Sequence, residues 1–244
     1  MSNGPYNLGW AIQKAYTRAT RHTDTLSATN PLYLALAQIA DDVQRDWQDE
    51  PGIDWNSLYI QTDIGTIQQG VADYDNDSTI RKLSAREGDS IVLQQKSGIN
   101  NGQCWYYDIV SPEKLTEYRY RQAAALYQGE IHFANTPQNP IFPINDARIG
   151  AHIIVPGYLY VDDLLSPNQL IQVDDPQWLV YMMAAELVRT DFVRQNQYPN
   201  LLAIANNKMQ GMRQRNEDQV MEIPVDLDLF DIEPNVGLSS GGWY

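Results

Sequence analysis

The sequence has little cysteine and little histidine. Its 244 residues include one cysteine, Cys104, and three histidines, His22, His132 and His152. A single cysteine cannot form an internal disulfide, and the aromatic run 105–107 beside it is typical of a strand, so we expect a buried structural thiol rather than a reactive one. Because no histidine has a second histidine or a cysteine at metal-ligand spacing, the sequence predicts no zinc site and no cofactor.

Positive charge is also scarce. Lysine and arginine number 17 against 31 aspartates and glutamates, which gives a formal net charge of −14 and a pI near 4.4. The nonspecific electrostatic term that drives nucleic-acid binding would be repulsive for such a chain. Hydrophobic residues make up 43% of the chain and charged residues 20%, so we expect a folded protein with a substantial core.

Long apolar runs are missing. No segment approaches the ~20 apolar residues that a membrane helix requires. The first residues, Met1 to Trp10, lack a basic region followed by an apolar run, and they carry no lipid-anchor motif. We therefore expect a soluble protein that is made in a cytoplasm and has no membrane partner.

A helical pattern lies near the start of the chain. A short helix is expected around residues 8–16, followed by a polar loop over residues 17–29. Asn30 can cap a second helix with Pro31 at its first position, and this helix should stop near Asp49. Its apolar stripe consists of Leu32, Leu36, Ile39, Val43 and Trp47.

Two further helices are predicted near the end of the chain. Asp174 or Asp175 can cap the first of them, and Pro176 suits its first turn. Its apolar positions, at spacings of three and four, are Trp178, Tyr181, Met182, Ala185, Val188 and Phe192. After residues 198–200 the pattern restarts with apolar Leu201, Leu202, Ala205, Met209 and Met212, and with polar Asn206, Asn207, Lys208, Arg213 and Asn216. The two helices should form a hairpin.

The middle of the chain has a sequence pattern that is typical of β-strands. Short β-prone runs, separated by turn residues, occupy residues 58–60, 79–83, 90–94, 105–109, 130–133 and 152–155. A short helix from Ser111 interrupts them. The predicted fold is therefore α+β, with a helical bundle from residues 1–51 and 175–216, a β-rich insertion at 52–174 and an extended arm at 217–244. Because an amphipathic helix is marginal alone, the helices from both ends should pack together, through Leu36, Ile39, Val43, Trp178, Phe192 and Leu201.

The last residues favour an interface over a local core. From Met221 to Ile232 apolar residues alternate with acids, the period of an extended strand, while Pro224 and Pro234 discourage a helix. One interpretation is a disordered acidic tail. We favour an arm that becomes ordered when it binds another chain. The candidate interface residues of this arm are Ile223, Val225, Leu227, Leu229, Phe230, Ile232, Trp243 and Tyr244. The candidate polar contacts between neighbouring subunits, which a solvated helix face explains equally well, are Arg189, Arg194, Lys208, Arg213 and Arg215.

Several patterns suggest chemistry but have a simpler explanation. Residues 73–77 begin like a calcium loop, yet the sixth position is Ser78 rather than glycine and the twelfth is Ser84 rather than glutamate, so a solvated turn is preferred. Cys104 with His132 or His152 could form a thiol triad only through a geometry that spacing cannot supply. The paired acids 162–163 are more typical of a solvated surface than of a glycosidase.

Three segments resemble the head-to-tail connector, or adaptor, proteins of tailed bacteriophages. They are residues 41–47 (DDVQRDW), residues 153–159 (IIVPGYL), and the closing helical hairpin at 171–216. The helical parts match in order and spacing over about half of the chain. The β-rich middle is where such proteins differ most.

The resemblance implies a structural virion protein and not an enzyme. Such a protein forms a homo-oligomeric ring in the neck, commonly a dodecamer, which docks under the portal protein, receives the tail or nozzle proteins below, and lets genomic DNA pass without specific binding. Two other classes remain open: a glycan- or receptor-binding tail module, and a thiol hydrolase. The first is motivated by tyrosines that could stack on sugars, such as Tyr106, Tyr107, Tyr118, Tyr120, Tyr158 and Tyr160.

Overall fold

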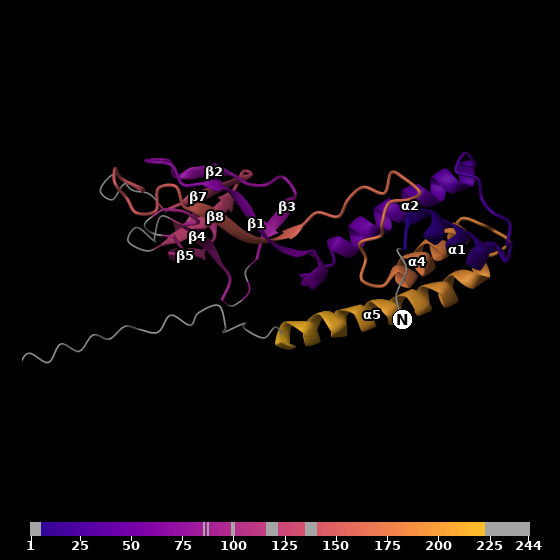
Figure 1. Cartoon of the computed structure of the whole chain (residues 1–244). Helices are drawn as coiled ribbons and strands as arrows, with labels where there is room; N and C mark the ends of the chain where they lie inside the picture. The colour runs from indigo at the N-terminus through magenta and orange to yellow at the C-terminus, as the bar shows by residue number, and fades with distance from the viewer. Residues whose placement is uncertain are drawn as a thin grey trace, which may run out of the picture.

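The computed structural model contains a body of helices and a curled β-sheet, which lie at opposite ends of the molecule (Figure 1). It describes residues 6–84, 86, 88–98, 101–115, 122–134 and 141–222, with side chains described as far as residue 218 in the last helix. The helices are α1 (Leu8–Thr20), α2 (Pro31–Gln48), η1 (Asn56–Leu58), α3 (Pro112–Leu115), α4 (Pro176–Arg189), η3 (Gln195–Gln197) and α5 (Tyr198–Glu222). The strands are β1 (Tyr59–Thr66), β2 (Asp73–Asp75), β3 (Ile80–Leu83), β4 (Ser90–Gln94), β5 (Cys104–Ile109), β6 (Ala123–Tyr127), β7 (Glu130–Phe133) and β8 (His152–Leu159).

Helices α2 and α4 begin where their capping residues predict. The Asn30 side chain accepts a hydrogen bond from the backbone N–H of Leu32, and Pro31 occupies the first turn of α2. Asp175 caps α4 in the same way, by accepting from the backbone N–H of Gln177. Asn7, which the sequence analysis did not single out, caps α1.

The helices from both ends of the chain pack into one body, and the predicted α+β fold is confirmed. α4 lies at its centre, in contact with α1, α2 and α5. A hydrogen bond of 2.7 Å from Arg18 to the Tyr181 hydroxyl fastens α1 to α4, and an ion pair of 3.0 Å between Lys208 and Asp175 fastens α5 to the start of α4. The fully buried side chains of this helical body include Ile12, Leu36, Trp47, Trp55, Leu179, Val180, Met183 and Ala184.

The sheet pairs strands that are distant in sequence. Among the described residues its order is β1-β8-β4-β5-β6-β7-β2, with β3 also paired to β8. Neighbours are antiparallel except β5 and β6, which are parallel. Its own core contains Ile91, Leu93, Tyr107, Ile131, Ile153 and Val155.

Strand β8 belongs to both cores. Val155 is buried with the sheet, whereas Tyr158, three residues later, is buried with the helices. Between them, Gly157 lies so close to β3 that an added Cβ would be 2.7 Å from Ile80 Cγ2 and 2.9 Å from the Lys82 carbonyl oxygen. Only glycine fits this position, because both atoms belong to the paired strand.

Two predictions about the helices were wrong. Helix α1 runs to Thr20 instead of stopping at residue 16, and Ala19 in its last turn is fully buried in the helical core. The hydroxyls of Thr17 and Thr20 donate to backbone carbonyls one turn earlier. Helix α4 ends at Arg189, so Phe192 lies in the following turn, 92% exposed, and not in the core. Of the other residues predicted to hold the bundle, Leu36, Val43 and Trp178 are buried, and Ile39 and Leu201 pack half-buried against the core.

The end of α5 also differs from the prediction. The helix continues to Glu222, so residues 217–222 are helical and the extended arm was predicted to begin too early. Neither proline nor glycine occurs in this stretch to stop the helix. The remaining arm, residues 223–244, lies outside the described residues.

In the sheet, six predicted strands are present and two were missed. β6 begins with three fully buried alanines, which neither alternate nor have high strand propensity. β2 coincides with the acidic run 73–75, which was expected to be a turn; Tyr74 instead packs its ring against Phe133. The thiol of Cys104 is half-buried rather than buried, 3.7 Å from the Gly102 carbonyl oxygen.

Candidate functional site

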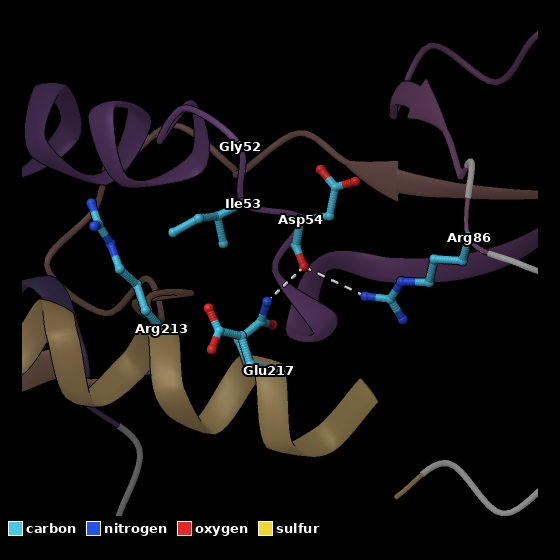
Figure 2. Close-up of a pocket in the computed structure, with 7 residues that line it drawn as sticks. Gly52, Ile53, Asp54, Arg86, Arg213 and Glu217 are labelled. Atoms are coloured by element: carbon cyan, nitrogen blue, oxygen red, sulfur yellow. Dashed lines mark hydrogen bonds between the residues drawn. The ribbon is translucent and has the colours of Figure 1, made fainter. Parts of the chain in front are cut away.

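A cleft separates the end of α5 from the segment that links α2 to β1. We call this cleft of about 410 Å³ the junction cleft. It is lined by Gly52, Ile53, Asp54, Arg86, Arg213, Asn216 and Glu217. Figure 2 shows Arg213 and Glu217 on one wall and the chain from Gly52 to Asp54 on the other.

Asn216 joins the two walls. Its side-chain oxygen accepts from the backbone N–H of Asn56 at 2.7 Å, and its side-chain nitrogen donates to the Asp54 carbonyl oxygen at 2.9 Å. The side chain of Asn56 in turn donates to the Asn216 carbonyl oxygen at 2.9 Å. The sequence placed Asn216 among the polar positions of its helix, but only 8% of it is exposed. It follows Ala205, Met209 and Met212 at spacings of three and four, and that spacing could have identified it as facing the core.

Arg86 closes the sheet side of the junction cleft. Its guanidinium donates to the side-chain oxygen of Asn56 and, at 3.5 Å, to the Asp54 carbonyl oxygen, as Figure 2 shows for the latter. The same group lies 5.2 Å from the ring centre of Tyr59 and 5.4 Å from that of Tyr158. The Tyr59 hydroxyl donates to Asp89 at 3.1 Å, and burial raises its pKa.

Ion pairs bridge the same junction. Arg213 pairs with Glu50, and Arg81 of β3 pairs with Asp49 at the end of α2, at 2.7 Å. Such exposed pairs contribute little individually. The Arg81 pair ties the sheet to the end of α2, whereas Arg213 and Asn216 tie α5 to the segment between α2 and β1. The junction is therefore a structural joint.

A second set of polar contacts lies on α2, where buried glutamines hold the chain that leaves β8. The Gln44 side chain donates to the Asp162 carbonyl oxygen and accepts from the backbone N–H of Gln172, both at 3.0 Å. One turn later, Gln48 accepts from the backbone N–H of Val161 at 2.7 Å. The segment between β8 and α4 therefore packs with the helices. Sequence reasoning missed both glutamines, because a buried polar residue on α2 has no local signal.

The predicted inter-subunit cations have partners within the chain. Arg189 pairs with Glu186 and Arg194 with Asp191, each at 2.9 Å and one turn apart. The partners of the others are Asp175 for Lys208 and Glu50 for Arg213, while Arg215 lines a cavity of about 360 Å³ with Asn56, Ser57, Asp174 and Asn216. Their contact with a neighbouring subunit stays a prediction.

The predicted arm contacts cannot be placed. Those residues, Ile223, Val225, Leu227, Leu229, Phe230, Ile232, Trp243 and Tyr244, all lie outside the described residues.

The possible triad residues are held apart by the sheet. Gln94 pairs with Cys104 on one side and with His152 on the other, so two strand spacings, about 10 Å, separate the backbones of those two residues. His152 Nδ1 lies 2.7 Å from Asp63 Oδ2. His132 is paired with Asp73, also at 2.7 Å, on the strands β7 and β2. The thiol therefore has no imidazole beside it.

The other chemical patterns also resolve into surface and packing roles. Asp77 accepts from the backbone N–H and the hydroxyl of Thr79, and Asp163 pairs with Arg45. Within the described ranges, no group of three histidines, cysteines or carboxylates could hold a metal ion. The tyrosines considered for sugar stacking are divided: Tyr107 and Tyr158 are buried, Tyr106 and Tyr160 are exposed, and Tyr118 and Tyr120 lie outside the described residues.

A second pocket lies on the helical body. We call this cavity of about 260 Å³ the helix pocket. It is formed by α2, α4 and α5 and lined by Val43, Asp46, Trp47, Glu50, Trp178, Met182, Asn206, Met209 and Arg213. Its lining combines apolar side chains with the charged residues Asp46, Glu50 and Arg213.

Comparison with known proteins adds no family to these observations. No protein-family model and no curated protein sequence matches the chain. In the part of the chain that the structure describes, no helix is both long enough and apolar enough to cross a membrane.

Proposed function

We propose that this chain is a head-to-tail connector protein of a tailed bacteriophage, a structural component of the virion neck. The observation that carries the proposal is the way the three segments of the resemblance meet. Residues 41–47 lie on α2, residues 153–159 form most of β8, and residues 171–216 contain the α4–α5 hairpin. Gln44, in the first segment, holds the chain that runs from the second segment to the third.

In this proposal the helical body forms the wall of a homo-oligomeric ring, commonly a dodecamer, under the portal. A chain with a net charge of −14 repeated around a channel repels DNA phosphates, so genomic DNA passes without binding. We expect part of the acidic surface to face that channel. A channel lined mainly by lysine and arginine would contradict this.

The arm supplies the contact with the portal. Apolar Val225, Leu227 and Leu229 alternate with acidic Asp226 and Asp228, a pattern that suits a strand added to the edge of another sheet. The tail or nozzle proteins would then meet the ring on its other side.

The test is electron microscopy of the purified chain mixed with the portal protein of the phage that encodes it. The expected result is a ring stacked on the portal. Removing residues 223–244 should abolish docking while leaving the thermal unfolding of the chain unchanged. A chain that forms no ring and binds no portal under these conditions would contradict the connector function.

A pair of variants separates the strand hypothesis from simple charge. Replacing Val225, Leu227 and Leu229 together by serine should abolish docking, because it removes the apolar edge of the strand. Replacing Asp226 and Asp228 by asparagine should preserve docking. The reverse result would show that the arm binds by charge.

A further inference from the structure

Strand β1 forms one edge of the sheet. In the part of the chain that the structure describes, β8 pairs with one side of β1 and no strand pairs with the other. Gln61 lies opposite Pro156, whose carbonyl oxygen accepts from the backbone N–H of Ser84 on the far side of β8. Opposite residues of an antiparallel pair face either toward each other or both away. The backbone groups of Gln61 and Asp63 therefore point outward, whereas those of Thr62 point to β8.

This outer side of β1, which we call the β1 edge, is incomplete. No described residue bonds to the outward backbone groups of Gln61 and Asp63. On the side of the sheet where Val155 is buried, Ile64 is only partly buried against the core, and Ile60 belongs to neither core. The β1 edge could therefore accept one more strand, and an apolar side chain at every second position of that strand would complete the core.

The end of α5 lies beside the start of the β1 edge. Asn216 is hydrogen-bonded to Asn56, which precedes β1 by three residues. From Asn216 the helix runs on for about 9 Å to its end at Glu222. Figure 1 shows α5 pointing from the helical body toward the sheet, the direction in which β1 also leads away from the joint. The arm, residues 223–244, therefore starts near β1 and is directed along it.

The apolar residues of the arm have the spacing that the β1 edge requires. Val225, Leu227 and Leu229 occupy every second position, and in an extended chain they span about 13 Å. The same number of residues separates Ile60 from Ile64, so the two apolar rows have equal length. With the rows side by side, the apolar side chains of the arm would continue the core of the sheet.

The acids of the arm would then lie on the opposite face of the sheet. Asp226 and Asp228 would stand beside Gln61 and Asp63, and like charges directly opposite each other destabilise a strand pair. The carboxylate of Asp63 already binds the Lys96 ammonium at 2.8 Å. This ion pair reduces the repulsion between Asp63 and the acids of the arm.

We propose that residues 225–229 add to the β1 edge of their own chain as a parallel strand, and that this pairing holds the arm back until the portal is present. The arm cannot pair with β1 and with a sheet of the portal at the same time. The apparent affinity for the portal is therefore lowered in proportion to the fraction of chains whose arm is free. The inference deepens the proposed function and rests on it for the role of the portal, since it names how the portal contact is regulated.

Amide hydrogen exchange measured by nuclear magnetic resonance tests the pairing directly. The full chain is compared with a chain that ends at Glu222. We expect the backbone amides of Gln61 and Asp63 to exchange at least tenfold more slowly in the full chain, at every protein concentration. The amide of Thr62 is the matched control, because it bonds to β8 and should be equally protected in both chains. So short a strand separates before the body unfolds, so its loss leaves thermal unfolding unchanged.

The variant Gln61→Pro tests the regulation. Proline is tolerated on an edge strand where its missing N–H faces solvent, but it blocks the addition of a further strand. If the arm is paired in nine chains out of ten, the variant should bind the portal about tenfold more tightly than the unmodified chain. Protection of the Thr62 amide in the same variant checks that β1 is still paired with β8.

The outcomes separate this inference from the connector function. Equal exchange of Gln61 and Asp63 in the two chains would overturn the pairing, even if the full chain still formed a ring on the portal. Protection that grows with protein concentration would also overturn it, because the occupant would then be the arm of a second copy. Concentration-independent protection in a chain that ignores the portal would support the pairing and refute the connector. Unchanged portal affinity in Gln61→Pro would overturn the regulation.

Discussion

In the helical body the helices α1, α2 and α4 are capped by Asn7, Asn30 and Asp175, each of which accepts a hydrogen bond from a residue two or three positions later. In the sheet the pairing is distant, as between Tyr59 on β1 and Tyr158 on β8. The first kind of contact is local and forms early, whereas the second requires closure of a long loop. The helices of this chain are thus specified by local contacts and its sheet by distant ones, although β8 contributes to the cores of both.

The largest effect should come from the core of the helical body. Trp47→Ala removes a ring that stacks on Trp55 at 4.8 Å and should lower the free energy of unfolding by about 3 to 5 kcal/mol. Because β8 enters both cores, we expect the sheet to unfold in the same transition. Urea unfolding followed by far-ultraviolet circular dichroism and by near-ultraviolet tyrosine signals checks this. Two separate transitions would show that the cores are independent.

A pair of glycines distinguishes the two regions with the same substitution. Gly157→Ala should cost about 3 kcal/mol, because the new methyl group would collide with β3. Gly211→Ala, on α5, meets only the end of the Arg215 side chain at 3.6 Å and should stabilise the chain by about 0.5 to 1 kcal/mol. Calorimetry of both variants should give shifts of opposite sign. Equal shifts would contradict the close approach of β3 to β8.

An ion pair in the turn segment before β8 should make the stability of the chain depend on pH. The Arg148 guanidinium hydrogen-bonds to Asp146 at 2.6 Å and holds the pKa of that carboxyl below its usual value; 10% of the Asp146 side chain and 22% of that of Arg148 are exposed. The stabilisation is present above the unfolded-state pKa of an aspartate, about 3.9, and is lost as the pH falls through the lowered folded-state pKa.

Asp146→Asn should remove that dependence and cost about 2 kcal/mol at neutral pH. Urea titrations from pH 7 to pH 2 measure both effects. Asp24→Asn, at an exposed position, is the control and should change neither. An unchanged pH profile in Asp146→Asn would show that other carboxyls carry the acid sensitivity.

The smallest loss of stability should come from the joint between the two regions. Asn216→Ala leaves the N–H of Asn56 and the carbonyl of Asp54 without their partner and should cost about 1.5 kcal/mol, since the junction cleft admits water to replace part of the bonding. Asn207→Ala, an exposed asparagine on the same helix, should be near neutral. Thermal unfolding of the two variants measures the difference. Equal stabilities would show that Asn216 does not stabilise the joint.

The sequence specified the helices better than the sheet for physical reasons. The caps at Asn30 and Asp175 could be predicted, because they act within one turn. Phe192 was placed wrongly because its spacing continued the stripe of α4, while the turn built by Asp191 ended the helix. The alanines that open β6 carry no strand signal, and their burial depends on neighbours distant in sequence.

The candidate site was less predictable than the fold. Arg86 and Gln44 bind backbone groups far away in the chain, and the sequence alone gives no reason to select them. Asn216 also binds a distant backbone group, but its helical spacing does indicate a core-facing position. The arm residues were selected from their pattern alone, and their role stays a prediction.

The sharing of β8 between two cores has a mechanical consequence. A strand whose Val155 is anchored in one core and whose Tyr158 is anchored in the other, three residues away, cannot act as a flexible tether. Torque on the helices is transmitted to the sheet through this strand, together with contacts such as the Arg81–Asp49 ion pair. The helical body and the sheet should therefore move together as one rigid unit.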